Sequence, residues 1–331
     1  MAYDGKILRR AYQKFEEDRQ QRQERFQSRR ESIFLRQPRL RQIEGELRTT
    51  MSRIIASALR RGTDPLPAVE VLKEENLGLQ EEKRRLLAQM GLPEDALEEK
   101  PACPLCGDSG YRGGQVCRCL RKYYAREQQK ELSRMLDLGG QSFETFSLSW
   151  YSDTYDPALG ISPRKNMARI LEICRNYAET FSQDSGSLLL TGDPGLGKTF
   201  LSAATARVVS GDGWSVVYDT AGRIFQRFEA QKFGREEGDG ASADVERVLG
   251  CDLLILDDLG TEMTTAFVQS ALYQIVNTRL LEKRPTILST NLKVEALHSR
   301  YSPQIASRIE GEYQILPFFG EDIRRLKRER G

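Results

Sequence analysis

SLLLTGDPGLGKTF at residues 187–200 joins a short apolar run to the pattern G-x-x-x-x-G-K-[ST]. The apolar run predicts a buried strand, and the residues from Thr199 onward predict a helix. The glycines between them let the backbone curl so that its N–H groups point at phosphate oxygens, and the helix N-terminus adds partial positive charge. The segment therefore predicts a loop that binds a nucleoside triphosphate; a glycine-rich turn without a ligand is the alternative.

Every residue of this loop is a candidate contact for ATP. We expect Lys198 to reach the β- and γ-phosphates and the Thr199 hydroxyl to complete the shell of a bound Mg²⁺. The candidate nucleotide-binding residues in this segment are Gly192, Asp193, Pro194, Gly195, Leu196, Gly197, Lys198, Thr199 and Phe200.

Two further strand ends carry polar side chains. LLILDD at 253–258 is expected to deliver Asp257 to the nucleotide and to Mg²⁺, directly or through water, because ligands bind at the carboxyl ends of parallel strands. Asp258 is placed to orient or deprotonate the attacking water, a role that Glu262 could share. Asn291 ends the next strand and is expected beside the γ-phosphate. Ordinary turn residues are the alternative at each position.

Apolar and helical segments alternate through the C-terminal half of the chain. Strands are predicted at 187–191, 214–219, 252–257, 285–290 and 313–318, with helices between them. Continuous apolar strands separated by helices indicate an α/β fold whose parallel sheet is covered on both faces. The polar, glycine-rich segment 232–244 is expected to form a mobile loop.

The N-terminal region is predicted to be helical, with a break near Pro38 and a second break over 61–67. Apolar side chains recur at steps of three and four on both sides of the second break. The first seam is Leu40, Ile43, Leu47, Met51, Ile54 and Ala58, and the second is Val69, Leu72, Asn76, Leu79, Lys83, Leu86 and Met90. Two such seams predict an antiparallel coiled-coil hairpin.

Four of the six cysteines follow the spacing C-x₂-C-x₁₀-C-x-C at Cys103, Cys106, Cys117 and Cys119. Clustered thiolates in a cytosolic protein favour a metal over disulfides, and four sulfurs without an open position indicate a structural Zn²⁺ site. Reduced thiols without metal are the alternative. The single histidine, His298, argues against Ser-His-Asp and poly-histidine metal chemistry.

Composition excludes some classes of protein. No run of 18 apolar residues occurs and the N-terminus lacks a secretory pattern, so we expect a cytoplasmic protein without a membrane span. The net charge is only +2, but residues 1–61 hold 16 Lys and Arg against 8 Asp and Glu. This excess suits nucleic acid or an acidic protein partner, and the exposed surface of solvated helices is the alternative.

The order of these motifs, followed by ASRIEG and GEDIR, resembles the DnaC/DnaI-type replicative helicase loaders and the related IstB transposition ATPases over about residues 140–331. These are AAA+ proteins. The resemblance implies that Asn291 is the sensor 1 residue. It implies that Arg308 is an arginine finger acting on a neighbouring subunit, and that Arg324 is the sensor 2 residue. A surface salt bridge is the alternative for Arg308, and a merely basic tail is the alternative for Arg324.

The resemblance also implies the architecture: an AAA+ P-loop domain with a five-stranded parallel sheet and no C-terminal lid. We divide the chain into a helical coiled-coil region at 1–99, a Cys₄ zinc module at 100–120, a helix and linker at 121–165, and the ATPase domain at 166–331.

The function that the resemblance implies is ATP-driven loading of a hexameric replicative helicase onto single-stranded DNA. The expected cofactors are ATP, Mg²⁺ and Zn²⁺, and the other expected partners are an AAA+ initiator ATPase and further copies of the chain. Phe233 and Lys232 are candidate DNA contacts, while Phe225 and Phe228 are expected to face the core. The alternatives are an IstB-like transposition helper and a scaffold that binds nucleotide without hydrolysing it.

Overall fold

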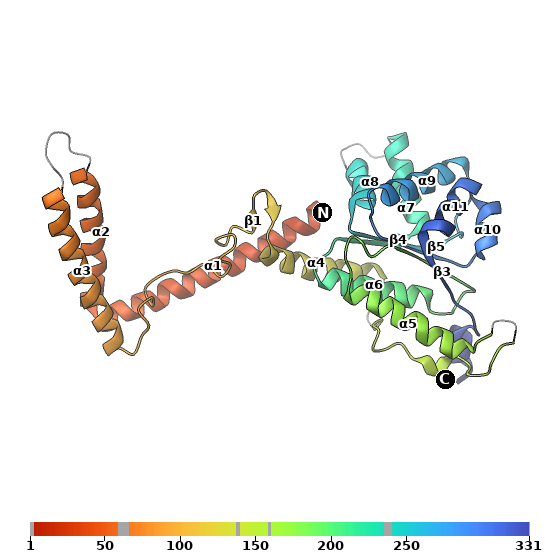
Figure 1. Cartoon of the computed structure of the whole chain (residues 1–331), viewed down its shortest axis with the longest axis horizontal. Helices are drawn as coiled ribbons and strands as arrows, with labels where there is room; N and C mark the ends of the chain where they lie inside the picture. The colour runs from red at the N-terminus through yellow and green to blue at the C-terminus, as the bar shows by residue number, and fades with distance from the viewer. Residues whose placement is uncertain (1–2, 59–65, 137–139, 158–159, 235–239, 331) are drawn as a thin grey trace. The chain divides into compact units, whose positions relative to one another are not determined.

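The computed structural model describes residues 3–58, 66–136, 140–157, 160–234 and 240–330 (Figure 1). The chain divides into two compact units, Met1–Gln13 together with Val116–Gly331, and Lys14–Gln115. Among the described residues, no helix combines the length and the apolar composition that crossing a membrane requires.

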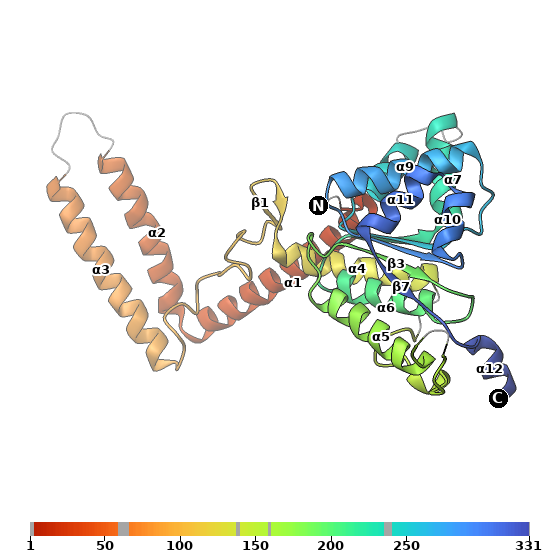
Figure 2. The same cartoon turned by 45° about the vertical axis from the view of Figure 1, so that its right-hand side comes forward.

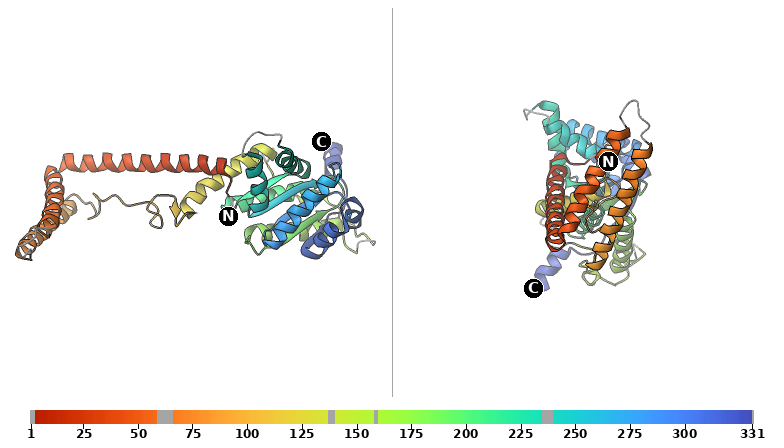
Figure 3. Two further views of the ribbon diagram at one scale, coloured as in Figure 1. Left: turned by 90° about the horizontal axis from the view of Figure 1, so that it is seen from above. Right: turned by 90° about the vertical axis from the view of Figure 1, so that its left-hand side faces the viewer.

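The helical region begins with α1 (Gly5–Arg36), which is followed by α2 (Pro38–Ala58) and α3 (Leu66–Gln89). Pro38 stands at the first position of α2, where its fixed φ suits a helix and its missing N–H costs nothing. Helices α2 and α3 lie side by side in every view (Figures 1 and 3). The predicted helical hairpin is therefore present. The predicted break over 61–67 lies largely within residues 59–65, which are outside the described part of the chain.

Part of the predicted seam can be followed at the end of the hairpin where α2 begins. Leu40 and Ile43 are fully buried there, and Leu40 packs in one cluster with Leu87 of α3. The seam lysine, Lys83, pairs with Glu44 of α2 at 2.9 Å, so a polar side chain on the seam meets an opposite charge. For the seam residues from Met51 to Leu72, the structure describes the helices but not the side chains.

The other unit is built on a five-stranded parallel sheet, as predicted. Its strands are β3 (Ser187–Thr191), β4 (Val216–Thr220), β5 (Leu253–Leu259), β6 (Thr286–Thr290) and β7 (Tyr313–Pro317). Their order across the sheet is β4-β5-β6-β3-β7. Strand β3 therefore pairs with β6 on one side and β7 on the other, so the loop after β3 leaves the sheet between two neighbouring strand ends.

Helices cover both faces of the sheet, because each strand is apolar on both sides (Figure 2). One layer contains α4 (Arg118–Leu136), α5 (Pro163–Glu179) and α6 (Lys198–Gly211). The other contains α7 (Ala221–Phe233), α8 (Gly240–Gly250), α9 (Ala266–Leu281), α10 (Val294–Arg300) and α11 (Pro303–Glu312). Leu188 and Leu190 of β3 face the first layer and Leu189 faces the second, which is the alternation of a strand.

Two segments differ from the expectation. Residues 240–244 of the expected loop 232–244 belong to α8, because Val245 and Val248 of this helix are buried in the core. After β7, the basic tail forms a short helix, α12 (Ile323–Arg330). Helix α4 and residues 140–151, which we expected to be a helix and a linker, belong to the same compact unit as the sheet.

A buried arginine joins α8, α9 and the start of β6. Arg279 of α9 is fully buried. It donates hydrogen bonds to the carbonyl oxygens of Val248, Leu249, Cys251 and Pro285 at 2.7–3.1 Å, and to the Thr286 hydroxyl at 2.9 Å. One guanidinium thus satisfies carbonyls at the end of a helix and at the start of a strand, which are groups that would otherwise be buried without a donor.

We predict that Arg279→Met lowers the free energy of unfolding by at least about 3 kcal/mol, because several buried carbonyls lose their donor and each costs about 1–3 kcal/mol. Urea denaturation followed by circular dichroism measures this change. The control is Arg223→Met on α7, where the arginine side chain is 65% exposed; we expect a change within about 0.5 kcal/mol there. A loss in Arg279→Met as small as in the control would contradict the role given to the buried guanidinium.

Candidate nucleotide-binding site and cysteine cluster

The glycine-rich loop begins where β3 meets β7. The Phe318 N–H donates to the Thr191 carbonyl at 2.7 Å, which holds the end of β7 against the start of the loop. A Cβ atom on Gly192 would lie 2.1 Å from the Phe318 carbonyl oxygen, and the φ of Gly192 is +134°. Only glycine fits at this position, because both the backbone angle and the space exclude a side chain.

Two contacts from distant parts of the chain hold the loop in place. The Tyr151 hydroxyl donates to the Leu196 carbonyl at 2.8 Å. The Ile323 N–H, at the start of α12, donates to the Gly195 carbonyl at 3.2 Å. The loop is therefore fixed from both sides in a preformed shape, which reduces the ordering cost of binding phosphate.

A pocket of about 360 Å³ opens beside the loop. It brings together most of the predicted site residues: Pro194, Gly195, Leu196, Gly197, Lys198, Thr199, Phe200, Asp258, Asn291 and Arg324. Gly192, Asp193 and Asp257 lie next to these residues in the chain but do not line the pocket. The loop after β3, the start of α6, the end of β5, the residue after β6 and the first turn of α12 thus meet at the carboxyl edge of the sheet, where open α/β folds bind ligands.

Lys198 lies within the curve of the loop. Its side-chain amine donates to the Gly192 carbonyl at 2.5 Å and to the Asp193 carbonyl at 2.8 Å. Burial lowers the pKa of Lys198, and the carboxylates of Asp258, Asp257 and Asp193 act against this shift. The loop thus presents a buried cation whose hydrogen-bond partners are neutral carbonyls, an arrangement suited to an anionic ligand.

Asp257 lies behind the pocket wall and is 4% exposed. Its carboxylate accepts hydrogen bonds from the Tyr218 hydroxyl at 2.9 Å and from the Ser289 hydroxyl. Thr199, unlike Asp257, lines the pocket. Hydroxyl and carboxylate oxygens are the ligands that Mg²⁺ prefers, so the donor set fits this ion.

Asp258 is turned into the pocket by an irregularity in β5. The pairing of β5 with β6 shifts register between Leu256 and Leu259, and Asp258 has a φ of +54°. A bulge of this kind redirects a side chain that regular pleating would send elsewhere. Burial, and then the neighbouring Asp257 charge, raise the pKa of Asp258, while Lys198 and Arg324 lower it.

Glu262 does not line the pocket. Its carboxylate accepts hydrogen bonds from the Gly260 N–H at 2.9 Å and from the Tyr301 hydroxyl. These contacts hold the turn after β5 against the end of α10, so the geometry gives Glu262 a structural position instead of the one beside Asp258.

Several pocket residues were not predicted from the sequence. They are Gln141, Thr145, Phe146, Ser147, Trp150, Tyr151, Thr261, Ile323 and Lys327. Phe146 stacks on Tyr151 with ring centroids 5.8 Å apart, and the Lys327 amine lies 5.7 Å from the centroid of the Trp150 ring. The aromatic content of residues 143–151 was the available signal, but an aromatic cluster alone does not show which surface it covers.

Arg324, the expected sensor 2 residue, and Arg308, the expected arginine finger, lie in different places. Arg324 lies in the first turn of α12 and lines the pocket. Arg308 lies on α11, outside the pocket, where it contacts Tyr273. One chain therefore brings Arg324 to its own pocket and leaves Arg308 on another surface.

The phenylalanines of α7 divide as expected. Phe225 and Phe228 are buried, whereas Phe233 is 57% exposed. The Lys232 amine lies 5.9 Å from the centroid of the Phe233 ring and 5.3 Å from that of Phe267 on α9. Arg223 and Arg227 instead face Asp219. An exposed aromatic ring, a second ring and a lysine thus gather at the end of α7.

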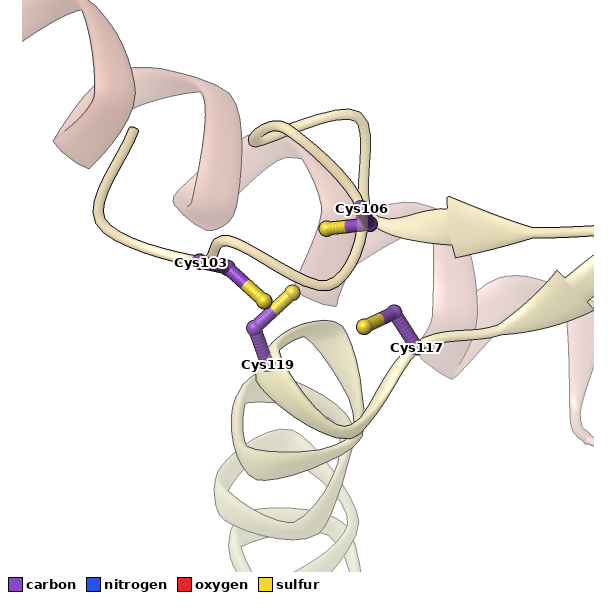
Figure 4. A group of neighbouring side chains, drawn as sticks. All are labelled: Cys103, Cys106, Cys117 and Cys119. Carbon is purple, nitrogen blue, oxygen red and sulfur yellow. The ribbon is translucent and has the colours of Figure 1, made fainter. Parts of the chain in front are cut away.

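The four clustered cysteines form one group, with all sulfur atoms within 4.8 Å of one another (Figure 4). The chain turns back between Cys106 and Cys117 through the short strands β1 (Tyr111–Arg112) and β2 (Gln115–Val116). Zn–S bonds of about 2.3 Å in a tetrahedron place sulfurs about 3.8 Å apart, so the group fits a zinc ion after small movements.

The loop around the cysteines is held by its own hydrogen bonds. The Asp108 carboxylate accepts from the backbone N–H groups of Ala102 and Cys103 at 2.9 and 2.8 Å. Cys103 and Cys117 are buried, and Cys106 and Cys119 are half-buried. The thiols thus converge on a small, largely enclosed space.

The fold and the pocket define this unit as a P-loop nucleotide-binding protein. Comparison with known proteins agrees: residues 168–316 match the family model of the IstB-like ATP binding protein. An insertion sequence ATP-binding protein of Sinorhizobium fredii, y4pL, is 31% identical over 150 residues, which are 44% of this chain and 59% of that protein. The replicative helicase loader DnaC of Escherichia coli is 28% identical over 157 residues, which are 47% of this chain and 63% of that protein.

Residues 168–316 therefore match an IstB-like ATP-binding domain, and this part of the chain is related in sequence to the helicase loader DnaC, so the resemblance stated from the motifs is confirmed. The matches span about 60% of the length of these two relatives. Among solved structures, the crystal structure of the DnaC helicase loader is similar over 54% of this chain and 97% of the loader chain, with 22% sequence identity and a TM-score of 0.44.

We predict about one zinc ion per chain, bound by the four cysteines. Cys106→Ser should remove this zinc, as measured by mass spectrometry of the purified protein for metal content. Cys174→Ala is the matched control, because Cys174 is buried alone in α5. A chelator should disorder residues 100–120 and leave ATP binding intact. Equal zinc in Cys106→Ser and in the control would rule out a site made by this cluster.

Proposed function

We propose that this chain is an AAA+ ATPase that loads a hexameric replicative helicase onto single-stranded DNA. The observation that carries the ATPase part is the convergence of Lys198, Thr199, Asp258, Asn291 and Arg324 in one pocket. The similarity to DnaC over the ATP-binding domain supports the loading role.

The residues of the pocket have separate tasks in ATP hydrolysis. Lys198 exchanges the carbonyls of its own loop for phosphate oxygens, so that an anion meets its buried charge. Asp258 accepts the hydrogen bond of the attacking water, as a general base does. Asn291 orients that water or the γ-phosphate, and Arg324 places a second cation beside the phosphates.

Thr199 and Asp257 are the residues that would hold Mg²⁺. When bound, this ion neutralises charge on the β- and γ-phosphates. Tyr218 and Ser289 hold the buried Asp257 carboxylate in place through hydrogen bonds from their hydroxyls.

Hydrolysis also depends on assembly. Arg308 does not line the pocket of its own chain, and we propose that it reaches the γ-phosphate held by a neighbouring subunit. An arginine supplied in trans couples turnover to self-association. The scaffold alternative, in which nucleotide is bound without turnover, is disfavoured by a carboxylate at Asp258 directed into the pocket.

Single-stranded DNA is proposed to contact the end of α7. Phe233 offers an exposed ring for stacking on a base, and Lys232 lies beside it to follow the phosphate backbone. Phe267, in contact with Phe233 at 5.9 Å between centroids, extends this surface.

The N-terminal part is proposed to grip the helicase. We retain the division into a coiled-coil region at 1–99, a zinc module at 100–120, a helix and linker at 121–165 and an ATPase domain at 166–331. The basic excess before residue 62 suits an acidic face of a partner. We also propose a cytoplasmic location and contact with an AAA+ initiator ATPase.

An IstB-like transposition helper is the second candidate, because the insertion sequence protein y4pL is 31% identical over the same domain. Such a helper would direct a transposase to target DNA. The long N-terminal helical region with its cysteine cluster favours the loader.

We predict that Lys198→Ala abolishes ATP binding, because the loop loses its buried cation. Arg308→Ala should bind ATP like the unaltered protein but hydrolyse it about 1000-fold more slowly or worse. Equilibrium binding of a fluorescent ATP analogue and release of phosphate measure the two effects. Unchanged turnover in Arg308→Ala would show that the arginine does not act in trans.

The loading function predicts that the full chain places the helicase of its own organism on circular single-stranded DNA. Such DNA has no end for the ring to thread, so bound helicase reports ring opening. Recovery of helicase on the circle should require ATP and fail with Lys198→Ala. Binding of a transposase, with no binding of helicase, would instead establish the second candidate.

A further inference from the structure

Arg308 lies against a tyrosine on a neighbouring helix. Its side chain donates to the Tyr273 hydroxyl at 3.4 Å, and its guanidinium carbon lies 5.4 Å from the centroid of the Tyr273 ring. Tyr273 belongs to α9 and is 38% exposed. The pair is thus a surface contact between α9 and α11, outside the nucleotide pocket.

The contact with Tyr273 does not neutralise the charge of Arg308, because the tyrosine side chain is uncharged. Within the described part of the chain, Arg308 forms no ion pair with a carboxylate. Glu310, two residues further along α11, is bonded instead to His298 of α10 at 2.8 Å. The face of a tyrosine ring attracts and orients a guanidinium without neutralising it, whereas a carboxylate would cancel the charge.

We propose that Tyr273 is the positioning residue of Arg308, and that it acts in the subunit that donates the arginine. The inference rests on the proposed function of Arg308 in trans. A free arginine side chain loses rotational freedom when it meets a phosphate, and ordering it beforehand reduces that loss. Tyr273 thereby supplies the next subunit with a guanidinium that is ordered and still fully charged.

The two halves of the contact can be separated by substitution. Tyr273→Phe keeps the ring face and removes the weak 3.4 Å hydrogen bond. Tyr273→Ala removes both. From the strength of exposed cation–π contacts, we expect Tyr273→Ala to lower kcat about two- to fivefold and Tyr273→Phe to stay close to the unaltered protein. The KM for ATP should not change, because Tyr273 does not line the pocket.

Mixed assemblies identify the subunit in which the tyrosine acts. Full-length Lys198→Ala chains bind no ATP but keep Arg308, and full-length Arg308→Ala chains bind ATP but lack the arginine. Neither chain alone should turn over ATP. Their mixture should, at interfaces where the first chain donates Arg308 to the pocket of the second.

Tyr273→Ala is then introduced into one chain at a time. In the donor of Arg308 it should lower turnover of the mixture about two- to fivefold. In the chain that binds ATP it should have no effect. Leu281→Ala is the matched control in the donor, because Leu281 is an exposed residue of the same helix.

Three results would overturn the inference. Unchanged turnover with Tyr273→Ala in the donor would show that Arg308 needs no such partner. An equal loss from either chain would mean that the tyrosine supports the fold or the assembly, not Arg308. A mixture that regains no turnover before Tyr273 is altered would remove the trans role itself, and the inference with it.

Discussion

The nucleotide site is organised around one buried positive charge. Lys198 is 5% exposed and its nearest acceptors are two backbone carbonyls of its own loop. Burying an ammonium is costly unless negative charge lies close by. Asp257 and Asp258 lie near enough to offset part of that cost. An anionic ligand would offset the rest of this cost, so the buried charge of Lys198 favours the binding of phosphate.

The rest of the site consists of distant segments brought to that charge. Tyr151, which precedes the sheet, and Ile323, which follows it, both bond the carbonyls of the loop. The first turn of α12 then carries Arg324 into the pocket. Arg308 belongs to α11 and contacts Tyr273 of α9 instead. A single chain thus brings Arg324 to the nucleotide pocket and leaves Arg308 outside it, against Tyr273.

Local sequence was enough to predict the loop and the cysteine cluster, since each depends on residues that are close in the chain. The alternation of apolar strands with helices was enough to predict a parallel sheet, although not the pairing of its strands. Two other features could not be predicted in this way: the helix of residues 240–250, and the part of the pocket lining that residues 146–151 supply. Val245, Val248 and Tyr151 are buried by contacts with elements far away in sequence. From sequence alone, a glycine-rich or aromatic segment is indistinguishable from a loop, because its structure depends on the distant residues against which it packs.

The sequence by itself determined where a triphosphate binds, because the curl of the loop and the charge of Lys198 are properties of consecutive residues. Only the tertiary structure decided which carboxylate faces the pocket. Adjacent residues in a regular strand point to opposite faces, so Asp257 and Asp258 cannot be assigned from their order alone. The bulge in β5 turns Asp258 toward the pocket, while Ser289 and Tyr218 hold Asp257 behind it. The bulge arises from the pairing of β5 with β6, which no local segment of the chain specifies.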